Sequence, residues 1–206
     1  MKIYKMPIVS MYAEDRPREK RSPFKILIAT ILSLRTKDAT TAKASRRLFA
    51  YGDSPQEILS IPSGKLEKLI YPVGFYKVKT ATIHHVCDTL LNRYGGKVPS
   101  DLDELLTIKG VGRKTANLVV TLGFNLPGIC VDTHVHRISN RWGYVKTATP
   151  DKTETALRRM LPKKYWIEYN DLLVTFGQNV CLPVSPFCSS CKLPGICRKT
   201  GVKKSR

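Results

Sequence analysis

The sequence has no long hydrophobic run, few acidic residues and no stretch in which apolar and polar residues alternate. Its longest apolar segment, residues 24–34, is interrupted by Lys25, Thr30 and Ser33, so it falls short of the roughly 18 residues that a membrane span requires. The first 21 residues contain no apolar segment that could serve as a secretory signal, so we expect a cytoplasmic protein with no membrane partner. The lack of alternation argues against a half-buried β-sheet.

The charge is strongly one-sided. Lysine and arginine number 35 against 16 aspartate and glutamate residues, which gives a net charge of +19. An excess of this size predicts a polyanionic partner, most often a nucleic acid. The alternative is that the charge serves only solubility.

Helix signals recur along most of the chain and predict an all-α fold. Ser22 and Pro23 begin a segment that is apolar nearly all round and therefore reads as a central buried helix. Residues 54–57 form a capping box, and the helix predicted from Tyr76 is closed by a pair of glycines after Tyr94.

The six cysteines fall into two groups. Cys87 and Cys130 are solitary in apolar surroundings and are predicted to be small buried hydrophobes. The other four lie within 17 residues in the pattern C-x6-C-x2-C-x5-C: Cys181, Cys188, Cys191 and Cys197. Four thiols so close in a reducing compartment favour metal binding over two disulfides or four free thiols, and the spacing leaves zinc and an iron–sulfur cluster both open.

Residues 105–117 predict two helices joined by a glycine turn. Glycine lets the backbone approach a ligand closely, and the N–H groups at a helix start bind phosphate without reading sequence. The alternative is an ordinary connection between helices. The candidate DNA-binding residues are Lys109, Gly110, Val111, Gly112, Arg113 and Thr115.

Lys114 and Asp132 form a candidate catalytic pair. Lys114 falls in the first turn of its helix, where the helix dipole and neighbouring Arg113 both disfavour an added positive charge. A free amine beside a carboxylate suits Schiff-base chemistry. The alternatives are that Lys114 binds phosphate and that Asp132 is a helix N-cap.

Three signatures together resemble the endonuclease III family of DNA repair glycosylases. They are residues 110–117 (GVGRKTAN), residues 131–134 (VDTH) and the four-cysteine loop, and they occur in the family's order and spacing. The resemblance extends from about residue 22 to residue 197. It identifies the chain as a member of the helix-hairpin-helix superfamily with a Gly/Pro-rich loop and aspartate.

The resemblance implies a fold, a cofactor and an activity. It implies a six-helix lobe over residues 22–131 and a second lobe made of residues 1–21 and 132–206, with a [4Fe–4S] cluster on the loop 181–197. Lys114 would attack the sugar, release the base and cleave the strand by β-elimination, and Asp132 would stabilise the transition state. The expected substrates are oxidised pyrimidines and abasic sites in double-stranded DNA, bound by a monomer associated with the nucleoid.

The resemblance also suggests three further DNA contacts. Phe75 falls where the family carries a loop that fills the gap left by the flipped nucleotide, although a buried aromatic at this position is the alternative. Arg35 stands where the family often has glutamine, and His134 follows the motif aspartate by two residues. The loop between the first two clustered cysteines lacks the basic residues that are usual in the family.

Three alternative functions remain at this point. A mismatch thymine or uracil glycosylase of the same superfamily commonly carries another residue in place of Lys114. An adenine glycosylase would also lack this lysine and usually has a further C-terminal domain. A non-catalytic helix-hairpin-helix module would use the hairpin only as a phosphate clamp.

Overall fold

The computed structural model describes residues 22–206, and the expected placement of residues 1–21 in the second lobe lies outside them. The described chain contains helices and loops but no strand, which confirms the all-α prediction. It divides into two compact units, residues 22–126 and residues 127–206. None of its helices has the length and apolar character needed to cross a bilayer.

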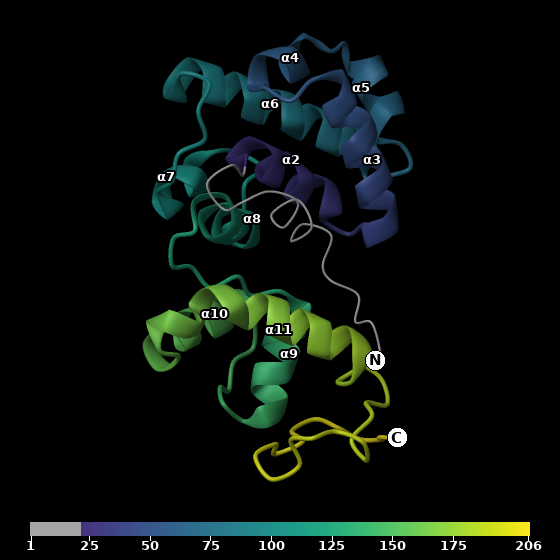
Figure 1. Ribbon diagram of the computed structural model, residues 1–206, viewed down its shortest axis with the longest axis vertical. Coiled ribbons are helices and arrows are strands. Elements are labelled where there is room, and N and C mark those ends of the chain that lie inside the picture. The colour runs from purple at the N-terminus through teal and green to yellow at the C-terminus, as the bar shows by residue number, and fades with distance from the viewer. Residues whose placement is uncertain (1–21) are drawn as a thin grey trace. The chain divides into compact units, whose positions relative to one another are not determined.

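The first unit is built around one buried helix. Its elements are α2 (Pro23–Ser33), α3 (Asp38–Tyr51), α4 (Pro55–Ser60), α5 (Ser63–Ile70), α6 (Tyr76–Tyr94), α7 (Leu102–Thr107), α8 (Arg113–Leu118) and the π-helical turn η2 (Val119–Gly123). Helix α2 contacts α3, α6, α8 and η2 (Figure 1). Eight of its 11 residues are buried. The prediction of a central buried helix is therefore confirmed.

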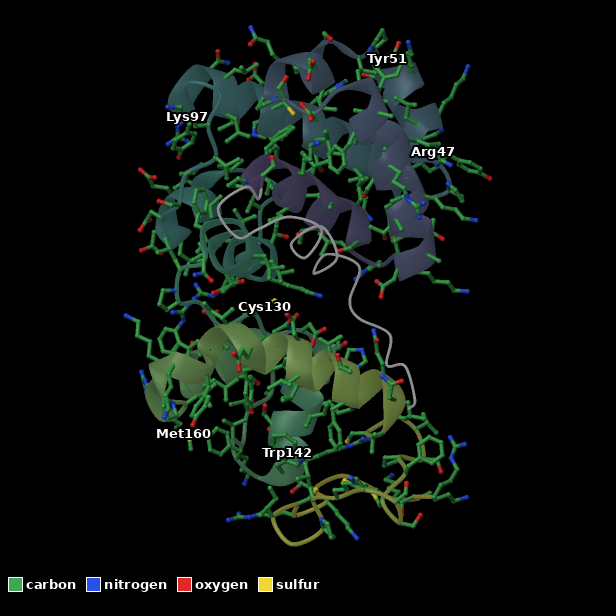
Figure 2. The ribbon with its side chains drawn as sticks, in the orientation of Figure 1. Arg47, Tyr51, Lys97, Cys130, Trp142 and Met160 are labelled. Carbon is green, nitrogen blue, oxygen red and sulfur yellow. The ribbon has the colours of Figure 1, made fainter. Side chains whose placement is uncertain are left out.

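Local signals set the helix ends of this unit. The Ser22 hydroxyl accepts a hydrogen bond from the Lys25 amide, and Ser54 and Glu57 form the predicted capping box at the start of α4. Helix α6 ends at Gly95 in the left-handed conformation, with φ +57°. The exposed side chains include Tyr51 and Lys97 (Figure 2).

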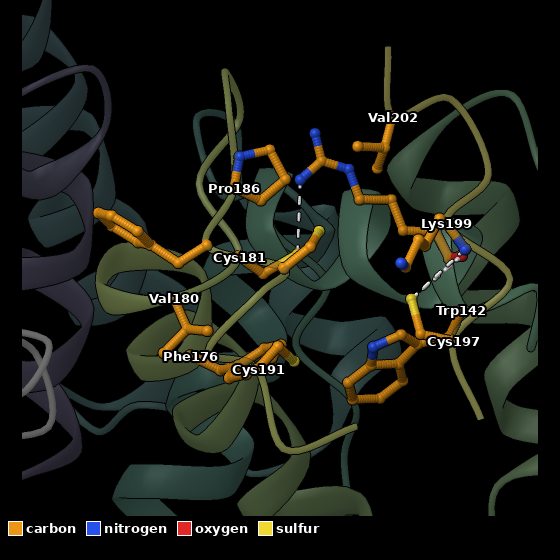
Figure 3. Close-up of a pocket in the computed structure, with 12 residues that line it drawn as sticks. Trp142, Phe176, Val180, Cys181, Pro186, Cys191, Cys197, Lys199 and Val202 are labelled. Atoms are coloured by element: carbon orange, nitrogen blue, oxygen red, sulfur yellow. Dashed lines mark hydrogen bonds between the residues drawn. The ribbon is translucent and has the colours of Figure 1, made fainter. Parts of the chain in front are cut away.

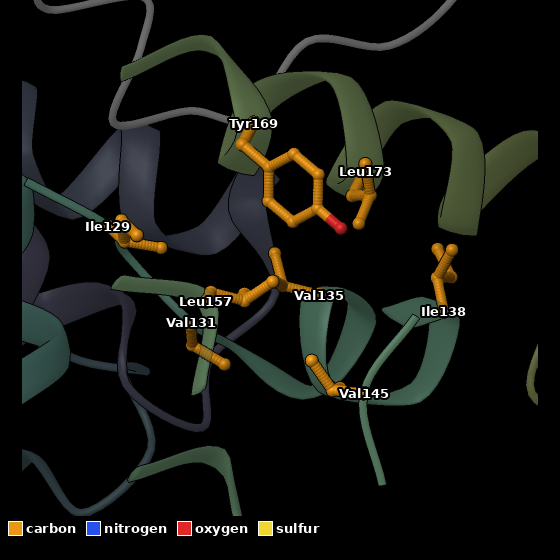
Figure 4. Close-up of a cluster of buried hydrophobic side chains, with 8 residues drawn as sticks. All are labelled: Ile129, Val131, Val135, Ile138, Val145, Leu157, Tyr169 and Leu173. Atoms are coloured by element: carbon orange, nitrogen blue, oxygen red, sulfur yellow. The ribbon is translucent and has the colours of Figure 1, made fainter. Parts of the chain in front are cut away.

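The second unit packs its helices around a separate core. Its elements are α9 (Thr133–Trp142), α10 (Pro150–Met160), the 3-10 turn η3 (Lys163–Tyr165) and α11 (Trp166–Asn179). Eight buried residues form the core (Figure 4): Ile129, Val131, Val135, Ile138, Val145, Leu157, Tyr169 and Leu173. After α11 the chain continues to residue 206 without a helix and carries all four clustered cysteines.

Candidate functional site

The turn between α7 and α8 is a tight hairpin that requires glycine. The Val111 amide donates to the Ile108 carbonyl at 2.9 Å, and the buried Val111 side chain anchors the turn. Gly110 has φ +96°, and a Cβ atom there would collide with the Cγ2 atom of Thr82 on α6. The hairpin backbone is thus fixed both by its own conformation and by its packing against α6.

Replacing Gly110 with alanine is expected to lower the free energy of unfolding by about 1–3 kcal/mol, because a side chain at this φ is strained and Thr82 must move. Urea denaturation measures the change. The matched control is Gly64→Ala in α5, where a Cβ meets nothing within 4 Å and helix propensity favours alanine. An unchanged midpoint for Gly110→Ala would show that the turn is not constrained.

Lys114 is the second residue of α8, as the sequence predicted. Gly112 is the N-cap and offers no side chain to the first-turn amides, and its carbonyl accepts from the Ala116 amide at 2.9 Å. Lys114 and Arg113 are half-buried. The Thr115 side chain is 1% exposed, so it packs inside the unit rather than offering its hydroxyl to the surface.

Asp132 is the N-cap of α9. Its Oδ1 atom accepts hydrogen bonds from the amides of His134 at 2.8 Å and Val135 at 2.9 Å. The N-cap interpretation is confirmed, and the cap fixes the orientation of a half-buried carboxylate at the positive end of a helix. The catalytic role of Asp132 stays a prediction.

Arg35 and Phe75 meet at the surface of the first unit. The Arg35 guanidinium carbon lies 5.7 Å from the centre of the Phe75 ring. Phe75 is 60% exposed, which excludes the alternative of a buried aromatic. Both residues have a left-handed backbone, with φ +53° and +58°, so each sits at the tip of a sharp turn.

One face of α6 runs from this pair to the hairpin. Val78 and Thr82 are spaced four residues apart in α6 and therefore share a helix face, and Phe75 is the N-cap of the same helix. Val78 is 65% exposed, and the methyl group of Thr82 lies against Gly110. Helix α6 thus carries Phe75 at its start and packs against the glycine hairpin at Thr82.

All four clustered cysteines line one pocket in the second unit (Figure 3). The pocket has about 320 Å³ of empty space, part of it open to solvent. Its other walls are mostly apolar, with Arg141 and Lys199 as the charged members: Arg141, Trp142, Phe176, Val180, Pro186, Phe187, Lys199 and Val202. All four thiols are free, contrary to the disulfide alternative, and nowhere in residues 22–206 are three or more ligating side chains gathered closely enough to hold a metal ion.

Arg141 joins α9 to both ends of the cysteine loop. Its guanidinium donates to the Cys181 Sγ atom at 3.4 Å and to the carbonyls of Leu182 at 2.6 Å and Pro183 at 2.7 Å. Its own carbonyl accepts from the Thr200 amide at 3.1 Å. Hydrogen bonds to a coordinating side chain fix its orientation, so this contact suits a metal ligand.

His134 and Arg137 are held within the second unit. One Arg137 amine nitrogen lies 3.1 Å from His134 Nδ1 and donates to the carbonyls of Gly177 at 3.3 Å and Cys181 at 2.9 Å. Burial, assisted by the positive charge of Arg141, lowers the pKa of Arg137. The Nδ1 side of the imidazole is therefore occupied, and the DNA contact proposed for His134 stays a prediction.

Sequence reasoning missed two buried cations, Arg141 and Lys79. Arg141 is 8% exposed and Lys79 is 6% exposed. The sequence does contain a pattern that predicts the burial of Lys79. This residue stands four residues before buried Ile83 and so falls in register with the apolar face of α6. A charged residue in register with the apolar face of a helix indicates that its charge is buried and has hydrogen-bonding partners inside the protein.

Residues 28–163 match the HhH-GPD superfamily of base excision DNA repair proteins, and the matched span includes both the hairpin and Asp132. The chain therefore belongs to this superfamily. Within it, the chain belongs to the endonuclease III family: it is 46% identical over 182 residues to endonuclease III of Thermotoga maritima, across 88% of this chain and 85% of that protein. The resemblance noted in the sequence is confirmed.

Solved structures agree with this assignment. The chain superimposes with a TM-score of 0.83 on a trapped endonuclease III–DNA covalent intermediate, at 37% identity over 93% of this chain and 91% of that one. A thermostable thymine-DNA glycosylase is also similar, with a TM-score of 0.78 and 26% identity over 93% of this chain and 92% of that one.

Proposed function

We infer that this chain is a base excision repair DNA glycosylase with AP lyase activity. The observation that carries the inference is a lysine in the first turn of a helix that follows a glycine hairpin, in a chain of the endonuclease III family. Its partner is double-stranded DNA that contains a damaged base or an abasic site. A similar protein has been solved as a covalent complex with DNA, which supports a covalent route.

Lys114 and Asp132 divide the chemistry. The Lys114 amine attacks C1′ of the deoxyribose, the C1′–N bond to the base breaks, and the base leaves with a proton. The C1′–O4′ bond then opens, O4′ takes up a proton, and the bond between C1′ and Nζ becomes a Schiff base. The Schiff base acidifies C2′, and loss of the C2′ proton expels the 3′ phosphate by β-elimination. The Asp132 carboxylate stabilises positive charge on the sugar and assists proton transfer.

The substrate class is oxidised or ring-damaged pyrimidines such as thymine glycol. The lesion is turned out of the stack before Lys114 attacks, since C1′ is not accessible to an amine inside an intact duplex. The hairpin amides, with Lys109 and Arg113, bind the phosphates next to the lesion. Arg35 and Phe75 contact the stack, and His134 contacts the lesion strand.

The four clustered cysteines hold a [4Fe–4S] cluster. Members of the endonuclease III family generally carry this cofactor. Four cysteines, the donor set that such a cluster requires, line one largely apolar pocket. The Cys181 sulfur accepts an N–H from Arg141, and the Cys197 sulfur accepts the Lys199 amide at 3.4 Å. When bound, the cluster supplies structural cross-linking of residues 181–197.

The protein acts as a monomer at the nucleoid.

Binding to DNA is expected to weaken steeply with salt. Each phosphate contact releases a condensed counterion, so the logarithm of the binding constant falls by about 0.9 per contact for each tenfold rise in salt. Titration of an abasic-site duplex at several salt concentrations gives the slope. A flat response would show that the excess of positive charge does not face DNA.

Strand cleavage on defined duplexes tests the proposed function. The purified protein should nick duplexes that carry thymine glycol or an abasic site and leave undamaged DNA intact. Cleavage confined to a G·T mismatch would instead indicate a mismatch glycosylase. Tight binding with no reaction on any duplex would indicate a non-catalytic module.

A further inference from the structure

Lys79 is a buried lysine whose ammonium group has a complete set of partners. Its Nζ atom donates to the Leu32 carbonyl at 2.8 Å, the Leu34 carbonyl at 2.5 Å and the Thr36 hydroxyl at 3.1 Å. An ammonium has three protons, and each of them finds an acceptor here. Burying a charge without such partners is costly, so the three acceptors stabilise the Lys79 ammonium in its buried position.

The three acceptors all belong to the end of α2 and the turn after it. Carbonyls at the C-terminus of a helix lack intrahelical partners, and the negative end of the helix dipole attracts a cation. Lys79 therefore caps α2 from a neighbouring helix. The turn that it holds contains Arg35, whose backbone has the left-handed φ of +53°.

Thr36 connects this turn to a second one. Its hydroxyl oxygen contacts Lys79 and also accepts the Gly74 amide at 3.1 Å. Gly74 sits so close to the Arg35 carbonyl that a Cβ there would lie 2.7 Å from the oxygen. Phe75 follows directly, so the two turns are joined at their tips.

We propose that Lys79 is a positioning residue that, together with Thr36, holds Arg35 and Phe75 as a single wedge for entry into the DNA stack. The proposal rests on the proposed function. The paired guanidinium and ring fill the space that a displaced nucleotide leaves, and they do so only while both turns keep their relative position. Lys79 itself touches no DNA.

Burial lowers the pKa of Lys79 to about 8. At neutral pH the group therefore still carries all three donor protons for its three acceptors.

The experiment compares cleavage of an abasic site in duplex and in single-stranded DNA. A single strand has no stack to hold open, so its cleavage needs Lys114 but not the wedge. Lys79→Met removes the donors at similar length, and Thr36→Val removes the shared hydroxyl at equal size. The matched control is Thr80→Val, because the buried Thr80 hydroxyl makes no hydrogen bond among the described residues.

We expect Lys79→Met and Thr36→Val to slow duplex cleavage about tenfold or more while single-strand cleavage stays within about twofold. Thr80→Val should change neither rate. Equal slowing on both substrates would overturn the proposal, because it would indicate general loss of folding. Absence of cleavage of both substrates by the unchanged protein would instead contradict the proposed function.

A fluorescent reporter separates positioning from stability. 2-Aminopurine opposite the abasic site changes its emission when the stack around it is opened. The unchanged protein should produce this change on binding, and Lys79→Met should lose it to the same extent as Phe75→Ala. A full change with Lys79→Met would show that the wedge enters without the lysine.

Discussion

Lys114→Gln is expected to lose strand cleavage by about 10³-fold or more, with binding to an abasic-site duplex reduced only slightly. An amide cannot form a Schiff base, so the route through a covalent intermediate is closed, whereas the hairpin and its phosphate contacts remain. Single-turnover cleavage and a binding titration measure the two effects separately.

The matched control for this variant is Lys109→Gln. Lys109 lies in the same hairpin, is exposed and loses the same charge. It should weaken binding and reduce the salt slope by about one contact while leaving single-turnover cleavage at saturating protein unchanged. If Lys114→Gln retained lyase activity, another amine would have to be the nucleophile.

Cys191→Ser is expected to lose most of the bound iron. The purified protein should hold about four iron atoms per chain and absorb in the visible blue, and both signals should fall together in the variant, because one thiolate ligand is missing. The segment from residue 181 to residue 206 contains no helix, and the proposed cluster would cross-link it through four thiolates. Thermal unfolding should therefore shift to a lower temperature.

Cys87→Ala is the control for the cluster. Cys87 is fully buried in α6, and burial raises the pKa of its thiol to about 12, so it does not supply a thiolate. The iron content of the Cys87→Ala variant should equal that of the unchanged protein. A colourless protein with one zinc ion per chain would contradict the iron–sulfur assignment. It would still be consistent with the four cysteines as the metal ligands.

Much of the fold could be predicted because its signals are local. The caps at Ser22 and Ser54 and the glycine end of α6 each follow from residues within one turn of the chain. Burial of Cys87 and Cys130 was likewise predicted and is confirmed. The π-helical turn η2 was not predicted, since a π-turn depends on packing rather than on a sequence pattern.

The site could be predicted only in part, for the same reason. The position of Lys114 in a first turn and the cap made by Asp132 involve neighbours in sequence. Lys79 contacts residues 43–47 positions away, and Arg141 contacts residues 40–42 positions away. No local pattern encodes such partners, although a cation in register with an apolar helix face indicates that one exists.

Covalent trapping identifies the nucleophile. Borohydride reduces a Schiff base to a stable amine, so incubation with an abasic-site duplex should give a protein–DNA adduct. Digestion and mass spectrometry should locate the sugar remnant on the Nζ atom of Lys114. An adduct on another residue, or no adduct from a preparation that binds the duplex, would contradict the role of Lys114 as the nucleophile.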